Sequence, residues 1–186
     1  MGVVDPSGGL TPDEGGGAAG WVEIASVDVA SATSGLLESV FTDSFDKYAI
    51  TGRNLTLSDR LVFRVAVGTT INSGDEYYMA DLYAGVGNNP NNNGSDQPPA
   101  SLSFMQFVNL DMSGDPDETT NFNMDVDRVD SDTFHFTWRG GYMLIGAAWA
   151  TVQGAGFTRN PHDGIQFLGR LGGTFGSGLF TVYGVA

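Results

Sequence analysis

Short segments in which apolar and polar residues alternate dominate the sequence from residue 21 onward, and this alternation most constrains the fold. In residues 61–67 (LVFRVAV) the odd positions are large and apolar, and in residues 133–139 (TFHFTWR) the even positions are. Successive side chains of a β-strand point to opposite faces, so these segments predict strands with one buried face. Clusters of Gly, Asn, Asp and Pro separate the segments, as turns do in an all-β domain.

About ten strands are predicted in this way. The other candidates are residues 21–29, 48–57, 77–86, 102–110, 122–129, 142–152, 165–168 and 179–185. Helical periodicity is nearly absent, and residues 34–42 fit a helical turn and a strand equally well. Many short strands in one chain predict an all-β fold, a two-sheet antiparallel sandwich that is jelly-roll-like.

The chain divides into an arm and one domain. Residues 1–20 (MGVVDPSGGLTPDEGGGAAG) hold too few large apolar side chains to fold alone, so we predict an extended N-terminal arm. Fully extended, such an arm spans on the order of 66 Å, enough to reach a neighbouring subunit. Residues 21–186 are predicted to form the β-sandwich domain. Residues 87–99 (GNNPNNNGSDQPP) and 113–120 (SGDPDETT) are predicted to be exposed loops.

The charge balance is strongly acidic, with 22 Asp and Glu against 8 Lys and Arg and a net charge of −14. Nucleic acids and anionic membranes bind to basic patches, so the composition argues against both partners. Charged residues make up only 16% of the chain, so Ser, Thr, Asn and Gly must cover much of the surface. Such a surface suits close contact with other chains. The absence of Cys excludes disulfides, thiolate metal sites and Cys nucleophiles.

Two histidines are the candidates for a general base. His135 lies between Phe134 and Phe136 on a predicted strand and faces away from them, which indicates an ordinary strand surface residue. His162 lies in a turn-forming sequence, NPHDG, and turn geometry explains the neighbouring Asp163 better than an acid–base pair does. We therefore predict no catalytic residue and no enzymatic activity.

Two further runs resemble binding motifs only in part. The acidic residues 125–132 (DVDRVDSD) suggest calcium, but Arg128 falls where an EF-hand has glycine and Phe134 where it has glutamate. A solvated strand edge followed by a turn is the favoured interpretation. The glycine-rich residues 169–178 lack the Lys-Ser/Thr ending of a phosphate-binding loop, and a hairpin connection explains them better. No metal or cofactor site is predicted.

Aromatic side chains offer one more kind of site, because exposed rings on a β-sandwich bind sugars. The three tryptophans are Trp21, Trp138 and Trp149. Trp138 and Trp149 lie in the strongest strand patterns, where packing in the core is the default interpretation.

Two stretches at opposite ends of the predicted sandwich follow a shared pattern. Trp21 and Ile24 form W-x-x-I, residues 45–55 form F-D-x-Y-x-I-x-x-x-N-L, and residues 61–64 form L-x-x-R. Near the C-terminus, I-x-F at residues 165–167 precedes S-G-x-F-x-V-Y-G-V at residues 177–185. This combination resembles a family of tailed-bacteriophage virion proteins, small β-sandwich modules of tail, fibre and capsid-surface components, whose ending is I-x-F followed by S-G-x-F-x-L-Y-G-I.

The resemblance implies a non-catalytic module, often trimeric, at the outside of a particle. We expect a phage virion structural protein, and the short chain without fibrous repeats favours a capsid decoration or cement protein that stabilises the head. Its expected partners are its own copies, as a homotrimer, and the major capsid protein or other virion proteins through the arm. We expect assembly in the host cytoplasm, because the sequence shows neither a signal peptide nor an apolar span.

Two alternatives remain open. A tail-fibre or tail-tip protein would bind a host receptor glycan through the loop at residues 88–93 and through exposed aromatic residues. An acidic carbohydrate-active enzyme on the same scaffold would need two carboxylates roughly 5 to 9.5 Å apart in a cleft.

Overall fold

The computed structural model describes residues 20–72, 74, 77–86, 93–96, 104–107, 119–128, 133–144, 148–158 and 161–185. These residues contain thirteen β-strands and no helix. The strands are β1 (Trp21–Asp28), β2 (Ser34–Leu37), β3 (Lys47–Leu57), β4 (Leu61–Val67), β5 (Thr70–Ile71), β6 (Tyr78–Val86), β7 (Asn93–Asp96), β8 (Met105–Gln106), β9 (Thr120–Arg128), β10 (Phe134–Leu144), β11 (Ala148–Thr158), β12 (Gly164–Gly169) and β13 (Phe175–Val185). The predicted arm, apart from Gly20, lies outside the described residues.

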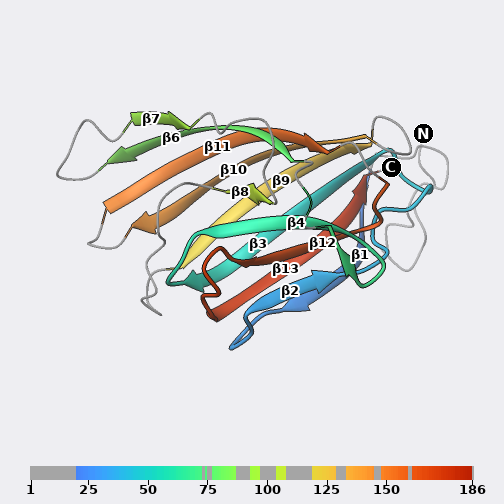
Figure 1. Ribbon diagram of the computed structural model, residues 1–186, viewed down its shortest axis with the longest axis horizontal. Helices are drawn as coiled ribbons and strands as arrows, with labels where there is room; N and C mark the ends of the chain where they lie inside the picture. The colour runs from blue at the N-terminus through green and yellow to red at the C-terminus, as the bar shows by residue number, and fades with distance from the viewer. Residues whose placement is uncertain are drawn as a thin grey trace, which may run out of the picture.

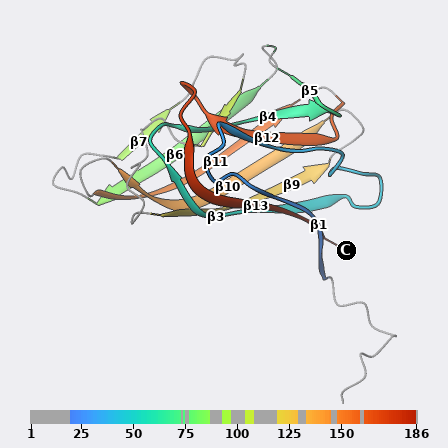
Figure 2. The ribbon, with the colours of Figure 1, turned by 90° about the horizontal axis from the view of Figure 1, so that it is seen from below.

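The strands form two antiparallel sheets that pack on one another (Figure 1). The larger sheet has eight strands in the order β1-β13-β3-β9-β10-β11-β6-β7. The smaller sheet has five, in the order β2-β12-β4-β5, with β8 also paired to β4. Figure 2 shows β4 and β12 of the smaller sheet above β3, β13 and β9 of the larger one. The predicted two-sheet antiparallel sandwich is confirmed.

The last two strands occupy inner positions in the two sheets. In the larger sheet β13 lies between β1 and β3, and in the smaller sheet β12 lies between β2 and β4. Strands near the C-terminus therefore join strands near the N-terminus on both sides of the sandwich. This arrangement brings the two stretches of the sequence pattern together.

Aromatic side chains fill the space between the sheets. Phe180 of β13 stacks on Phe167 of β12 with ring centroids 4.1 Å apart and planes 3° from parallel. Phe63 of β4 contacts Phe136 and Trp138 of β10, each at 5.6 Å between centroids. All five rings are buried. Because each contact joins strands of opposite sheets, these rings hold the sandwich together.

The predicted alternation holds in β10 but only partly in β4. In β10 the phenylalanines are buried and His135 is exposed, as predicted. In β4, however, Val62 and Ala66 are buried along with the odd positions, and the odd residue Val67 is exposed. The middle of β4 is therefore buried on both faces, and the prediction of one solvated face was wrong.

Residues 34–42, undecided from the sequence, contain the strand β2, which pairs with β12. The predicted break between residues 139 and 142 was wrong, since β10 continues through Gly140 and Gly141. A Cβ at Gly140 would lie 2.8 Å from Phe122 Cβ and 2.9 Å from Phe107 Cζ. Glycine is required there by close packing in the core, and not by a turn.

Residues 87–99, predicted to be a loop, contain the edge strand β7, which pairs with β6. Its sequence, NGSD, has no apolar alternation, and backbone pairing alone makes it a strand. Of the predicted strand at 102–110 only residues 104–107 are described, with β8 among them. Of the predicted loop at 113–120, only the last two residues are described, and Thr120 already belongs to β9.

The predicted hairpin in residues 169–178 was also wrong, because β12 and β13 belong to different sheets. The residues between Gly169 and Phe175 cross from one sheet to the other. This crossing is held by Asp59, whose carboxylate accepts hydrogen bonds from the backbone N–H of Leu171 at 2.6 Å and of Gly173 at 3.2 Å. The glycine-rich loop thus surrounds a carboxylate of its own chain.

Candidate functional site

An open groove of about 700 Å³ lies on the outer face of the larger sheet, the face turned away from the smaller sheet. We call it the arginine groove. It crosses β3, β9, β10 and β11. These four strands are neighbours in the larger sheet (Figure 1). Its exposed lining side chains are Arg53, Asn121, Asn123, Arg139, Thr151 and Gln153. Backbone around Gly52, Phe122, Gly140, Gly141 and Val152 completes the lining.

The register of the strands explains why these side chains gather. Arg139 of β10 lies opposite Asn123 of β9 on one side and Gln153 of β11 on the other. All three point outward because every second residue of a strand faces the same side. The next outward position on β10 is Gly141, which has no side chain, so the surface is hollow there.

The lining of the arginine groove carries two positive charges and no negative charge, in a chain with a net charge of −14. Within the described part of the chain, Arg53 and Arg139 have no ion pair, whereas Lys47 on the same face binds Asp127 at 3.2 Å. Each guanidinium offers five N–H donors, and the Asn and Gln amides both donate and accept hydrogen bonds. The groove is therefore suited to bind a polar ligand with an anionic group.

A second, more apolar depression of about 410 Å³ lies on the same face. Its rim is an aromatic row from three adjacent strands, Tyr78, Phe157 and His135. Tyr78 and Phe157 stack with centroids 4.7 Å apart, and the His135 ring lies edge-on to Phe157 at 6.2 Å. Along β10, His135 is four residues from Arg139, about 13 Å away. Between them, the outward side chains of β10 and β11 are the small ones of Thr137 and Ala155, and Asp125 of β9 lies opposite Thr137.

The two histidines predicted not to be catalytic lie apart. His135 is exposed in the aromatic row, whereas His162 is buried, with Nε2 at 2.9 Å from Thr158 Oγ1. The carboxylate of Asp163 accepts a hydrogen bond from the backbone N–H of Gly68 at 2.8 Å and so holds a turn. Asp163 therefore joins the turn after β4 to the segment before β12.

The acidic residues Asp125 and Asp127 point outward from β9. Because β9 lies between β3 and β10, the predicted strand edge was wrong, and these carboxylates lie on an interior strand. Residues 129–132 lie outside the described residues. In the described part of the chain no group of three or more His, Cys, Asp or Glu side chains is placed to hold a metal ion.

Residues of the two pattern stretches contact each other. A Cβ at Gly184 of β13 would lie 2.6 Å from the ring of Phe45, so only glycine fits under that ring. Ser177 Oγ donates a hydrogen bond to the backbone oxygen of Asn54 at 2.7 Å. Asn54 has a φ of 52°, a left-handed conformation that asparagine tolerates better than most residues. At these pattern positions, the packing of β13 against β3 and against the segment before β3 therefore restricts which residues fit.

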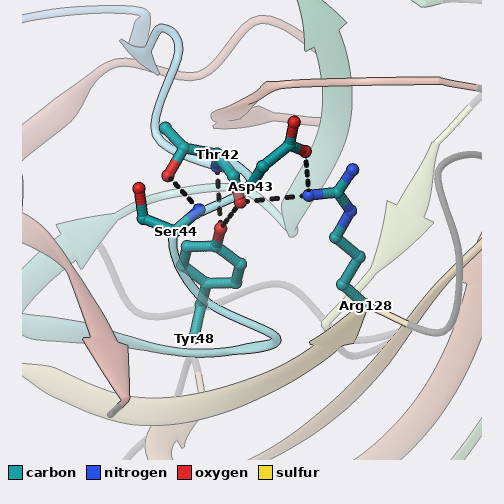
Figure 3. A network of polar contacts seen from close by, with 5 residues as sticks. All are labelled: Thr42, Asp43, Ser44, Tyr48 and Arg128. Carbon is teal, nitrogen blue, oxygen red and sulfur yellow. Dashed lines mark hydrogen bonds and ion pairs between the residues drawn. The ribbon is translucent and has the colours of Figure 1, made fainter.

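Another pattern residue, Tyr48, closes the corner before β3 (Figure 3). Its buried hydroxyl donates to the backbone oxygen of Thr42 and accepts from the Thr42 N–H at 2.7 Å. Arg128 Nη1 donates to the same oxygen at 3.1 Å and pairs with Asp43 at 2.5 Å. A tyrosine hydroxyl bonded to backbone a few residues upstream also fixes a corner in other β-sandwiches.

Substituting Tyr48→Phe is expected to lower the free energy of unfolding by about 1–3 kcal/mol, because the Thr42 N–H loses its partner. Urea denaturation followed by tryptophan fluorescence measures the change. Tyr183→Phe is the control, since the Tyr183 ring packs on Trp21 and its hydroxyl makes no hydrogen bond within the described residues. Equal losses in both variants would contradict the assigned role of the Tyr48 hydroxyl.

Sequence reasoning missed the arginine groove, because its side chains come from four strands and only the register brings them together. The available signal was the polar side chains at the outward positions 121, 123 and 139. No helix capable of crossing a membrane occurs among the described residues.

Compared with known proteins, the chain matches no family model, no curated protein and no solved structure significantly.

Proposed function

We propose that this chain is a non-enzymatic structural protein of a tailed-bacteriophage virion, displayed on the particle surface as a capsid decoration or cement protein that stabilises the head. The observation that carries the proposal is the mutual contact of the pattern residues, such as Gly184 under Phe45 and Ser177 on Asn54. Residues at these positions must fit one another in size, so the pattern describes how the two ends of the domain pack together. Under this proposal, the pattern shared with phage virion modules marks residues that must pack together.

The edge of the larger sheet offers a contact for a neighbouring subunit. β1 is an end strand of that sheet, so one side of its backbone is unpaired within the described sheet. Trp21 and Val22 on β1 are 58% and 51% exposed, and Leu179 of the adjacent β13 is 40% exposed. Unpaired backbone beside exposed apolar side chains favours contact with another chain. The arm sequence leads directly into β1, so an arm would leave the domain at this edge.

Deleting the gene from the phage that carries it tests the proposal. For a decoration protein, particles without it should adsorb to the host normally but lose infectivity faster on heating. Adding back the purified protein should restore heat resistance. Particles that keep full heat resistance and full infectivity without the chain would contradict the proposal.

A second candidate function is binding of a host receptor glycan by a tail-fibre or tail-tip protein. The arginine groove and the aromatic row favour it, because amides and guanidinium groups recognise saccharides and partly exposed rings pack on them. The groove is lined by groups that bind through hydrogen bonds, whereas glycoside hydrolysis uses a pair of carboxylic acids. Loss of adsorption without loss of heat resistance in the deletion particles would favour this function.

A further inference from the structure

We infer that the arginine groove and the aromatic row together form a binding site for a carboxylate-bearing oligosaccharide. This inference rests on the second candidate function, glycan binding, and names the class of glycan. The ligand would lie across β10 and β11, with its carboxylate at the arginines and the rest of the saccharide extending toward the aromatic row.

The two arginines determine the anionic part of the ligand. Arg53 and Arg139 are exposed and make no ion pair within the described residues, so their donors are available. A guanidinium binds a carboxylate through two parallel hydrogen bonds, which a neutral sugar does not offer. In a chain of net charge −14, a groove whose lining has only positive charge attracts an anion that the rest of the surface repels.

The remaining groups on this face fit the neutral part of a saccharide. Asn123 and Gln153 each present both a donor and an acceptor, which matches sugar hydroxyls. Asn121, whose Oδ1 accepts the Asn54 N–H at 2.9 Å, presents its amide N–H donors. Asp125 faces outward on β9, one outward position beyond Asn123, and can accept from a hydroxyl while repelling a carboxylate. Its charge therefore places the ligand's carboxylate at the Arg139 end. The aromatic row, about 13 Å from Arg139 along β10, offers apolar contact to a ligand longer than one sugar ring.

Other classes of ligand fit the site less well. A peptide that adds a strand needs an unpaired sheet edge, but β3, β9, β10 and β11 are each paired on both sides. A nucleic acid needs many phosphates to be neutralised at once, and the groove offers two guanidinium groups.

Calorimetric titration of the purified full chain tests the site. The probes are an oligogalacturonide, the same oligosaccharide with methyl-esterified carboxylates, and a sulfated dextran oligosaccharide. The oligogalacturonide should bind most tightly, and Arg53→Gln and Arg139→Gln should each weaken its binding about tenfold or more. The esterified probe should bind equally to the wild type and to the double variant. Phe157→Leu should weaken both galacturonide probes by a similar factor.

Lys47→Gln is the matched control, because it removes one positive charge from the same face outside the groove. It should change the affinity for the oligogalacturonide less than twofold. The inference is overturned if Lys47→Gln weakens binding as much as Arg139→Gln does. It is also overturned if the wild type does not prefer the acidic probe to its ester, or prefers the sulfated probe. Such failures concern only the class of glycan, because the adsorption and the heat resistance of deletion particles test the two proposed functions separately.

Discussion

Substituting Phe180→Ala is expected to lower the free energy of unfolding by about 3–5 kcal/mol, the usual cost of removing a fully buried phenylalanine. Phe180 has no exposed surface. Its ring stacks on Phe167 of the opposite sheet and meets Phe175 edge-on at 5.8 Å. Its loss therefore leaves a cavity between the sheets. Equilibrium denaturation in guanidinium chloride, followed by tryptophan fluorescence and circular dichroism, measures the change.

Two companion variants make this result specific. Phe180→Leu should restore most of the lost stability, because it refills much of the cavity. Leu171→Ala should change the free energy by less than about 0.5 kcal/mol, since Leu171 is 84% exposed. A cost below about 1 kcal/mol for Phe180→Ala would contradict the assigned packing between the sheets.

Substituting Asp59→Ala is expected to cost about 2–4 kcal/mol, because several backbone donors lose one shared acceptor. Asp59 is only 5% exposed, and its two oxygens accept from the N–H groups of Arg60, Leu171 and Gly173. The crossing between β12 and β13 should loosen as a result. Hydrogen exchange should then speed up at the Leu171 and Gly173 amides more than in β3.

Asp59→Asn should also destabilise the protein, because an amide replaces one of the two accepting oxygens with a donor. The matched control is Asp125→Asn, which makes the same chemical change on the exposed face of β9. Unchanged exchange at Leu171 in Asp59→Ala would show that the loop does not depend on this carboxylate.

The fold class was predictable because strand periodicity is a local property of the sequence. The alternation of Phe134, Phe136 and Trp138 identifies an inward face without any tertiary information. Glycine was harder to interpret, since the same residue marks a turn in one place and close packing in another. Gly140 lies within the paired strand β10, and it is a glycine because Phe107 and Phe122 occupy the space a side chain would need. That neighbour relation arises only in the folded chain.

The crossing loop shows a second limit. Glycine-rich sequence between two strands predicts a hairpin, but it does not reveal whether the two strands share a sheet. Asp59, far away in the sequence, binds the loop and belongs to no recognisable motif. The polar edge strand β7 was missed for a related reason, since it is defined by backbone pairing with β6.

Little of the candidate site was predictable from the sequence. The sequence correctly placed His135 on a strand surface, away from its phenylalanine neighbours. It did not place Arg53 and Arg139 in one groove, because their common position there depends on the register of β3, β9 and β10. A shift of one residue in that register would turn one of the two arginines toward the core.

Quantitative mass spectrometry of purified particles tests the proposed place in the virion most directly. Particles from the phage that carries the gene would be separated on a density gradient and washed with high salt. The predicted result is that the chain remains with the particles in a constant ratio to the major capsid protein. Absence from washed particles, although the chain is abundant in the lysate, would contradict it.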